Sequence, residues 1–136
     1  EDYVVVKKII KTDSEWEQLL TPEQFHVTRQ HGTESPFSGE YNDCKITGIF
    51  QCSCCEEPLF SSAHKFDSGS GWPSFWKPIS EDNIEYVSDT DYGMVRTEVN
   101  CKKCGSHLGH VFDDGPKPTN QRYCINSVSL KHEKDE

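Results

Sequence analysis

Cysteines are the residues of this chain whose spacing most clearly points to chemistry. Four of the seven form two Cys-x-x-Cys pairs, Cys52 with Cys55 and Cys101 with Cys104. Two thiolates three residues apart can bind one metal ion from a single tight turn, and two such turns complete a tetrahedral site. The spacing therefore predicts one structural zinc ion per chain, held by these four sulfur atoms.

A fifth cysteine, Cys124, lies in a segment where its thiol could react. In the sequence Arg122-Tyr123-Cys124-Ile125-Asn126, a β-strand would place Arg122, Cys124 and Asn126 on one face. The charge of Arg122 favours the ionised form of a neighbouring thiol, and the Asn126 amide can orient that thiolate or a substrate oxygen. The alternative is a buried, inert cysteine that packs as a small hydrophobic side chain.

Two histidines, His107 and His110, follow the second cysteine pair. One interpretation makes them zinc ligands together with that pair, in a local Cys₂His₂ site. The other assigns the metal to the four cysteines and leaves both imidazoles for acid–base work near neutral pH. The presence of the first cysteine pair favours the second interpretation.

A glycine- and serine-rich segment, residues 66–76, carries an aromatic cluster. An irregular loop of this kind can present aromatic rings to a small apolar group. We expect Phe75 and Trp76 to pack in the core. Trp72, which lies between a glycine and a proline, is our candidate for the wall of a substrate pocket.

The elements that position these residues begin with two short helices. We expect the first over residues 15–20, with Asp13 or Ser14 as its N-cap. Thr21 is expected to cap the second, because a proline at the first helical position and a glutamine at the third complete a capping signal. This second helix should end near residue 28.

Short β-like runs separated by turn residues dominate the chain on either side of the helices. The expected strands are residues 3–10, 48–52, 59–61, 84–88, 94–99, 110–113 and 122–130. Residues 31–43 are expected to form an extended loop, and the charged tail 131–136 is expected to fray. We expect Asp113 and Asp114 to cap a turn rather than to bind a metal.

Composition limits the class of protein. The chain has 136 residues, which suits a single domain, and 33% of them are hydrophobic. A net charge of −9 argues against nucleic acid or an anionic membrane surface as a partner, and apolar runs fall short of the roughly 20 residues that span a bilayer. Seven cysteines cannot all pair within one chain, which argues against the disulfide framework of a secreted protein. We therefore expect a cytoplasmic protein, or an organellar one if a targeting segment has been removed.

Three motifs together resemble one family closely. They are Lys-Phe-Asp-Ser-Gly-x-Gly-Trp-Pro-Ser-Phe, Cys-x-x-Cys-x-x-His-Leu-Gly-His-Val-Phe-Asp-Asp-Gly-Pro and Arg-Tyr-Cys-Ile-Asn-Ser. In this order, after a first Cys-x-x-Cys pair, they resemble the methionine-R-sulfoxide reductases of the B type. The similarity runs from about residue 14 to residue 130 and is highly specific.

The resemblance implies a mainly β fold of two antiparallel sheets with short N-terminal helices, in one domain over residues 1–136. A structural zinc ion would lie opposite the active site. The activity it implies is reduction of the R epimer of methionine sulfoxide, free or in proteins. The family pattern makes Cys124 the nucleophile, places polar groups around the sulfoxide and provides an aromatic wall for the substrate methyl group. The polar groups would be His107, His110, Arg122 and Asn126, and the wall would be Trp72.

In this chemistry, attack by Cys124 on the sulfoxide sulfur yields methionine and a sulfenic acid. A second thiol then forms a disulfide that an external dithiol such as thioredoxin reduces. Many family members carry this resolving cysteine where the present chain has Ser70. We expect Cys44 to take the role, because it lies in a glycine- and serine-rich loop. Cys54 and direct reduction of the sulfenic acid by an external thiol are the alternatives.

Two other functions compete with this one. A zinc-stapled β domain could be a non-catalytic module that binds a protein or a small ligand. A reactive Cys124 between Arg122 and Asn126 speaks against it, because a pure binding module needs no such thiol. A zinc hydrolase is disfavoured, since a site with four cysteine ligands leaves no position for water. A monomer is expected.

Overall fold

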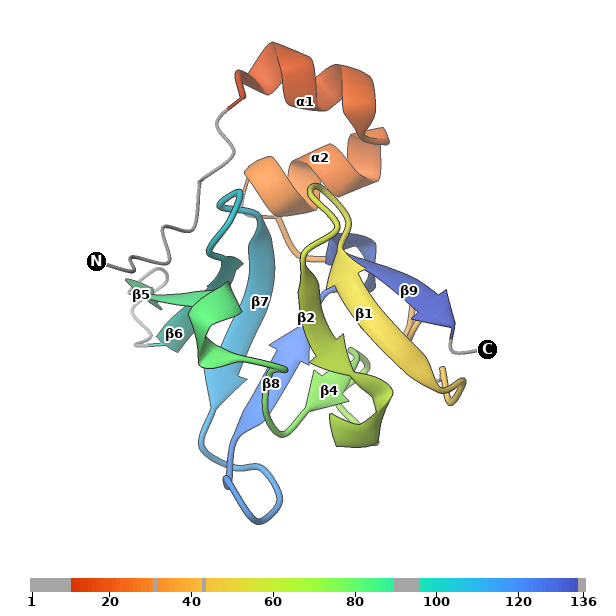
Figure 1. The fold of residues 1–136 in the computed structure, drawn as a ribbon, viewed down its shortest axis with the longest axis vertical. Helices are drawn as coiled ribbons and strands as arrows, with labels where there is room; N and C mark the ends of the chain where they lie inside the picture. The colour runs from red at the N-terminus through yellow and green to blue at the C-terminus, as the bar shows by residue number, and fades with distance from the viewer. Residues whose placement is uncertain (1–10, 31, 43, 90–95, 135–136) are drawn as a thin grey trace, which may run out of the picture.

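A computed structural model describes residues 11–30, 32–42, 44–89 and 96–134. Within these ranges two short helices precede a set of antiparallel strands (Figure 1). The helices are α1 (Asp13–Leu19) and α2 (Pro22–Arg29). The strands are β1 (Gly48–Cys52), β2 (Pro58–Ser61), β3 (Lys65–Phe66), β4 (Ser74–Phe75), β5 (Ile84–Asp89), β6 (Arg96–Cys101), β7 (His107–Phe112), β8 (Arg122–Ile125) and β9 (Leu130–Lys134). The strand expected over residues 3–10 lies outside the described residues.

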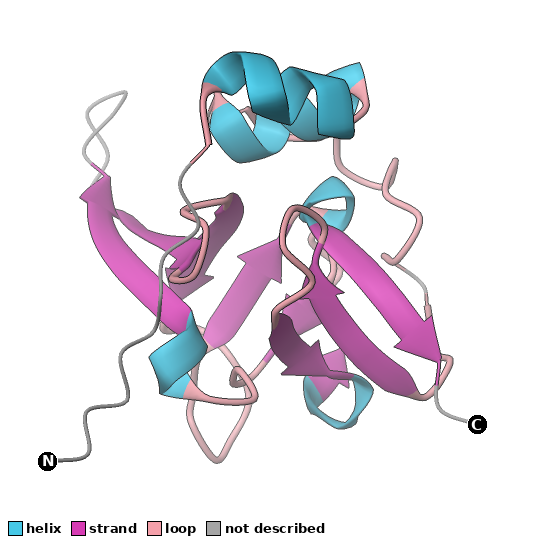
Figure 2. Cartoon of the chain, turned by 45° about the horizontal axis from the view of Figure 1, so that its top comes forward, coloured by secondary structure: helices cyan, strands magenta, loops and turns pink. Residues whose placement is uncertain are grey.

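The strands form two antiparallel sheets, as the sequence predicted. The smaller sheet has the order β2-β1-β9, and the larger has the order β3-β4-β8-β7-β6-β5. Helices α1 and α2 lie together at one end of both sheets (Figures 1 and 2). None of the helices in the described part of the chain is long and apolar enough to cross a membrane.

Both helices begin with a reciprocal capping box. Thr21 caps α2 as predicted, with its hydroxyl accepting from the N–H of Gln24. The prediction for α1 was wrong by one residue or more, since Thr12 rather than Asp13 or Ser14 is the N-cap. The glutamate at the third helical position of α1 bonds back to the Thr12 N–H, and this reciprocal bond selects Thr12 over its neighbours.

The C-terminal segment corrects the sequence prediction most. Residues 122–130 do not form one strand: β8 ends at Ile125, a 3₁₀ turn follows over Ser127–Ser129, and β9 begins at Leu130. The tail expected to fray is ordered through Lys134, because β9 pairs with β1 along its whole length. Period-two alternation cannot reveal where a chain leaves one sheet and enters another.

The core fills the space between the two sheets with aromatic and aliphatic side chains. Phe50, Phe60 and Phe75 are fully buried and contact one another. The prediction that Phe75 is a core residue is therefore confirmed. The same prediction was wrong for Trp76, which is only partly buried because its ring packs edge-on against His64 and beneath Lys77 rather than in the core.

A β-bulge interrupts the pairing of β6 with β7. Val99 pairs with Gly109, but the next residue, Asn100, pairs with His107, so Leu108 is an extra residue on β7. Residues three apart on a regular strand point to opposite faces. The bulge at Leu108 instead brings His107 to the same face as His110, and their rings lie 5.6 Å apart between centroids.

Candidate active site and metal centre

Cys124 lies in the middle of β8 with its two predicted neighbours beside it. Strand alternation buries Tyr123 and Ile125 in the core and turns the other face of β8 towards a cavity of about 300 Å³. The cavity is lined by Ser70, Trp72, His110, Arg122, Cys124 and Asn126, among others. The structure thus brings together five of the site residues that the sequence predicted.

The pairing register places an imidazole next to the thiol. His110 on β7 is the direct partner of Cys124 on β8, and Glu98 on β6 is the direct partner of His110 on its other side. Paired residues of antiparallel strands share a face and have Cβ atoms about 5 Å apart. The row Cys124–His110–Glu98 therefore crosses three strands and ends on a carboxylate.

His107 occupies a deeper position than His110. It is 3% exposed, and its Nδ1 lies 3.6 Å from Oε2 of the buried Glu98. Asn100 donates a hydrogen bond to the other oxygen of the same carboxylate, at 2.9 Å. Glu98 thus stands between Asn100 and His107, and His110 is the histidine that reaches the cavity. The sequence drew no attention to Glu98, because the bulge that assembles this group cannot be seen in it.

A backbone clamp holds two of the cavity residues. The Trp72 indole N–H donates to the carbonyl oxygen of Glu34 at 3.0 Å, and the Glu34 N–H donates to Oδ1 of Asn126 at 3.1 Å. Asn126 also donates through Nδ2 to the Leu108 carbonyl. The aromatic wall and the amide are therefore fixed relative to each other by one residue of the loop that follows α2.

The Glu34 side chain holds this backbone segment against the 3₁₀ turn over Ser127–Ser129. It is 5% exposed, and its Oε1 accepts the backbone N–H of Val128 at 3.1 Å. Burial raises the pKa of this carboxyl group. A Cβ atom on Gly39 would lie 2.3 Å from Glu34 Oε2, so only glycine fits beside it. The sequence analysis missed Glu34, which has no local signal of its own.

Arg122 is held at the cavity by Asp114. Its Nε and Nη2 donate to the two carboxylate oxygens of Asp114 at 2.8 and 3.2 Å, and its guanidinium lies over the Phe112 ring. The hydrogen bond from Arg122 lowers the pKa of Asp114. The sequence analysis expected Asp114 only to cap a turn, and this interpretation missed its ion pair across the β7–β8 hairpin.

The protonation of Cys124 differs from what its neighbours alone suggested. Burial raises the pKa of this thiol, although a hydrogen bond from Ser70, with the hydroxyl oxygen 3.8 Å from the sulfur, and the nearby charge of Arg122 lower it in part. Burial outweighs both because it removes the water that would solvate a thiolate. The substrate-free protein therefore holds Cys124 as a thiol near neutral pH.

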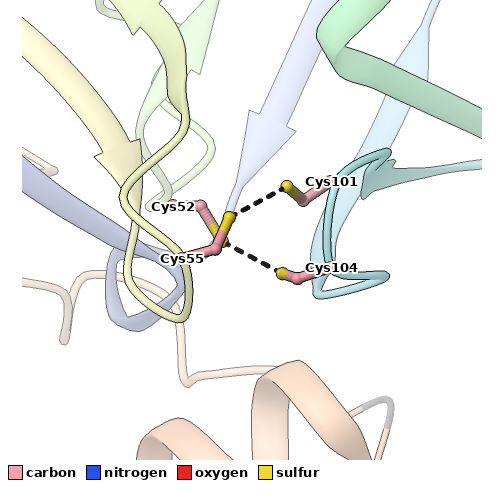
Figure 3. Close-up of side chains that lie close together, drawn as sticks. All are labelled: Cys52, Cys55, Cys101 and Cys104. Atoms are coloured by element: carbon pink, nitrogen blue, oxygen red, sulfur yellow. Dashed lines mark hydrogen bonds between the residues drawn. The ribbon is translucent and has the colours of Figure 1, made fainter. Parts of the chain in front are cut away.

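The four paired cysteines form a compact cluster in which the two pairs face each other (Figure 3). Cys52 and Cys55 come from the turn between β1 and β2, and Cys101 and Cys104 from the turn between β6 and β7. Their sulfur atoms all lie within 4.8 Å of one another, and the cross-pair distances Cys52–Cys104 and Cys55–Cys101 are both 3.6 Å. The cluster links the two sheets.

The sulfur positions fit a tetrahedral metal. A zinc ion with bonds of about 2.3 Å to four sulfurs separates those sulfurs by about 3.8 Å, close to the 3.6 Å observed. Hydrogen bonds from neighbouring thiols lower the pKa of Cys104, which favours the thiolate that a metal ion binds. Arg29 of α2 donates to Sγ and to the carbonyl oxygen of Cys104, at 3.1 and 2.7 Å.

Comparisons with known proteins place the chain in a family. Residues 20–134 match the SelR domain. A peptide methionine sulfoxide reductase MsrB of Hahella chejuensis is 59% identical over 124 residues, which are 91% of this chain and 89% of the relative. The chain belongs to the SelR family, with the MsrB proteins.

Relatives from distant organisms show the same match. The MsrB of Thioalkalivibrio sulfidiphilus is 60% identical over 119 residues, covering 88% of this chain and 87% of its own. That of Methanosarcina mazei is 57% identical over 129 residues, covering 95% and 92%. The resemblance identified from the motifs is therefore confirmed, and it extends over nearly all of each MsrB chain.

The remaining thiols of this SelR family member lie outside the cavity. Cys44 lines a separate hollow with Lys65 and Phe66 of the edge strand β3. Phe66 pairs with Ser74, and Ser74 pairs with Cys124, so two strand spacings, about 10 Å, separate β3 from β8. The structure does not bring Cys44 to Cys124. Cys54 lies beside Arg29 and the four-cysteine cluster.

Proposed function

We propose that this protein reduces the R epimer of methionine sulfoxide, free or within proteins, to methionine. The observation that carries the proposal is the direct pairing of Cys124 with His110 in a cavity whose wall is Trp72. Family membership supports the substrate class, because the relatives are named peptide methionine sulfoxide reductases.

The reaction joins the sulfur of Cys124 to the sulfoxide oxygen. The thiolate forms a bond to the substrate sulfur as the sulfoxide oxygen gains a proton. The substrate S–O bond and this S–S bond then break while the hydroxyl oxygen bonds to the Cys124 sulfur, so that the substrate sulfur gains two electrons and the products are methionine and a Cys124 sulfenic acid. Because burial keeps Cys124 protonated, the thiol must lose its proton as the substrate binds. His110 lies on the neighbouring strand as the direct partner of Cys124. Its imidazole can accept this proton and then donate one to the sulfoxide oxygen.

We propose that His107 acts through its neighbours rather than on the substrate. It is buried against Glu98, which is also the strand partner of His110. The Glu98 carboxyl group lies 3.6 Å from Nδ1 of His107 and is the strand partner of His110, so we propose that it fixes the positions of both rings.

Epimer selection follows from the two sides of the cavity. Trp72 offers an apolar surface for the substrate methyl group, while Arg122 and Asn126 offer donors to the oxygen. The sulfoxide sulfur is a stereocentre, so only one epimer places the methyl group on Trp72, the oxygen on the donors and the sulfur at Cys124. We assign the accepted epimer as R.

We propose that Cys44 resolves the sulfenic acid and that thioredoxin or a similar dithiol reduces the resulting disulfide. Ser70 holds its hydroxyl 3.8 Å from Cys124, so the position beside the nucleophile carries an oxygen and cannot form a disulfide. A Cys44–Cys124 bond needs Cα atoms within about 7 Å. The loop that carries Cys44 must therefore move towards β8 first.

Zinc is the metal we propose for the four-cysteine cluster. When bound there it would supply no reaction chemistry, since four protein sulfurs leave no ligand position for substrate. Cys52 and Cys55 would hold it from the smaller sheet, and Cys101 and Cys104 from the larger. Its contribution would be to fix the start of β7, the strand that carries His107 and His110.

One assay tests the proposed activity. The protein is incubated with racemic methionine sulfoxide and excess dithiothreitol, and the two epimers and methionine are separated by chromatography. We expect the R epimer to be consumed with matching formation of methionine, while the S epimer persists. Consumption of both epimers at equal rates contradicts the cavity geometry, and consumption of neither would leave a non-catalytic binding domain as the better description.

A further inference from the structure

Phe37 adopts a backbone conformation that a large side chain normally avoids. Its φ is 64°, in the left-handed region that favours glycine. Its side chain is 70% exposed, so core packing does not hold it in this conformation. Phe37 is the third residue of a turn that the Ser38 N–H closes on the Ser35 carbonyl oxygen at 3.2 Å. Its own N–H donates to the carbonyl oxygen of Gly71 at 2.7 Å.

This hydrogen bond places Phe37 at the rim of the catalytic cavity. Gly71 lies between Ser70 and Trp72, both of which line the cavity. A Cβ atom on Gly71 would lie 2.9 Å from Cδ2 of the Phe37 ring and 2.7 Å from Cβ of Pro36. The exposed Phe37 ring therefore lies against Gly71, which joins Ser70 to Trp72 in the lining of the cavity.

The cavity leaves most of a polypeptide substrate outside. Its volume of about 300 Å³ suits one side chain and not the backbone on either side of it. Neighbouring residues of an extended peptide are only about 3.3 Å apart along the chain. Residues one or two positions from a methionine sulfoxide must then pass over the rim that Phe37 and Pro36 form.

The two sides of the cavity differ in polarity. Asp114 and Arg122 form an ion pair on the hairpin between β7 and β8, whereas Pro36 and Phe37 present apolar surface next to Gly71. Methionine side chains in folded proteins are mostly buried among other apolar residues, and oxidation of a buried methionine disrupts that packing. The damaged segment then exposes apolar neighbours of the sulfoxide.

We infer that Phe37 is a docking residue for an apolar side chain that flanks methionine sulfoxide in an unfolded or locally unfolded polypeptide. The inference rests on the proposed reductase function and names the substrate class it serves. A non-glycine residue with a positive φ is a backbone outlier of the kind that clusters at binding sites.

The test compares Phe37→Asn with a matched control, Leu19→Asn. Asparagine tolerates the left-handed conformation and removes the ring. Leu19 is 65% exposed on α1, so the control removes a similar apolar surface away from the cavity. Three substrates are used: N-acetyl-methionine-R-sulfoxide, a pentapeptide with leucine on both sides of the sulfoxide, and the same peptide with serine on both sides.

We expect Phe37→Asn to lower kcat/KM about five- to tenfold on the leucine peptide, through KM, as the loss of one aromatic contact predicts. Activity on the acetylated amino acid and on the serine peptide should stay within twofold, and Leu19→Asn should match the wild type on all three. The melting temperature of Phe37→Asn should be unchanged or higher, because the backbone strain is relieved.

Two results overturn the inference: an equal loss on all three substrates, or no loss on the leucine peptide. A lower melting temperature together with a loss on every substrate would assign Phe37 a structural role instead. If the wild-type protein reduces none of the three substrates, the proposed reductase function itself fails, which is a different result from any of these.

Discussion

His110 and Cys124 lie directly opposite each other on the antiparallel strands β7 and β8. This register sets the distance between imidazole and thiol through backbone hydrogen bonds rather than through flexible side chains. The neighbouring pair Glu98–His110 continues the row into β6. The proposed nucleophile, the proposed proton carrier and a buried carboxylate are thus positioned by one sheet.

Cys124→Ser should abolish reduction of methionine-R-sulfoxide, to below about one thousandth of the wild-type rate, because a serine hydroxyl is a far weaker nucleophile. The variant should keep its zinc content and its circular dichroism spectrum, since Cys124 lies outside the four-cysteine cluster. The measurement is methionine release with excess dithiothreitol. Substantial release by this variant would move the nucleophile to another cysteine.

The raised pKa of Cys124 predicts a pH dependence of its alkylation. Iodoacetamide reacts with the thiolate, so the rate should be low near neutral pH and should rise as the pH passes the ordinary cysteine range. Mass spectrometry of the Cys124 peptide separates it from the other thiols.

Two variants should move that pH profile in opposite directions. Arg122→Gln removes a charge that lowers the pKa of Cys124, so its profile should shift to higher pH. Glu34→Gln removes a charge that raises the same pKa, so its profile should shift to lower pH. Shifts in the same direction would show that burial, and not these charges, changes in the variants.

Zinc removal should unfold the protein. A strong chelator, or Cys104→Ser, should remove the metal and lower the free energy of unfolding by more than the ~1 kcal/mol of an average substitution, because the cluster links both sheets. X-ray absorption of the intact protein should show four sulfur neighbours at about 2.3 Å. Cys54→Ser, within the same turn, is the matched control and should keep the metal. A mixed sulfur–nitrogen shell would instead return the site to His107 and His110.

Cys44→Ser should separate the first turnover from recycling. With stoichiometric substrate, the variant should release one methionine per protein, because Cys124 reaches the sulfenic acid without a second thiol. Thioredoxin-driven turnover should then fail, since thioredoxin attacks a disulfide. Cys54→Ser should behave as the wild type in both experiments. Undiminished turnover by Cys44→Ser would favour Cys54 or direct reduction.

Glu34→Ala should loosen the cavity wall. Loss of the carboxylate removes the acceptor of the half-buried Val128 N–H, at a cost of about 1 kcal/mol, and should raise KM for the R sulfoxide. The Trp72 indole N–H signal in a ¹⁵N NMR spectrum should shift, because its acceptor is the Glu34 carbonyl. Glu34→Gln keeps an acceptor oxygen and serves as the control. An unchanged indole signal and KM in Glu34→Ala would make Glu34 a stabilising residue only.

Local patterns in the sequence predicted part of this site correctly. Alternation along β8 placed Arg122, Cys124 and Asn126 on one face, and all three line the cavity. The Cys-x-x-Cys spacing predicted which four sulfurs converge. Both predictions rest on geometry within a few residues, which a strand or a tight turn fixes on its own.

Contacts between segments far apart in the sequence could not be predicted from these local patterns. The clamp of Glu34 on Trp72 and Asn126 joins three segments that only the folded chain brings together. Arg122 lowers the pKa of Cys124 as predicted, but the direction of the whole shift depends on how much water the fold excludes, which the sequence does not show. The strand exchange after β8 was likewise invisible, because alternation continues in both sheets.

The bulge at Leu108 limits how this chain can change in length. A change of length between Cys104 and His107 that made the ladder regular would pair Asn100 with Leu108 and turn His107 to the face opposite His110. The hairpin beyond Phe112 carries no such register and should accept an inserted residue more readily. Insertions and deletions should therefore be tolerated on the far side of β7 and rejected on the side nearest the metal cluster.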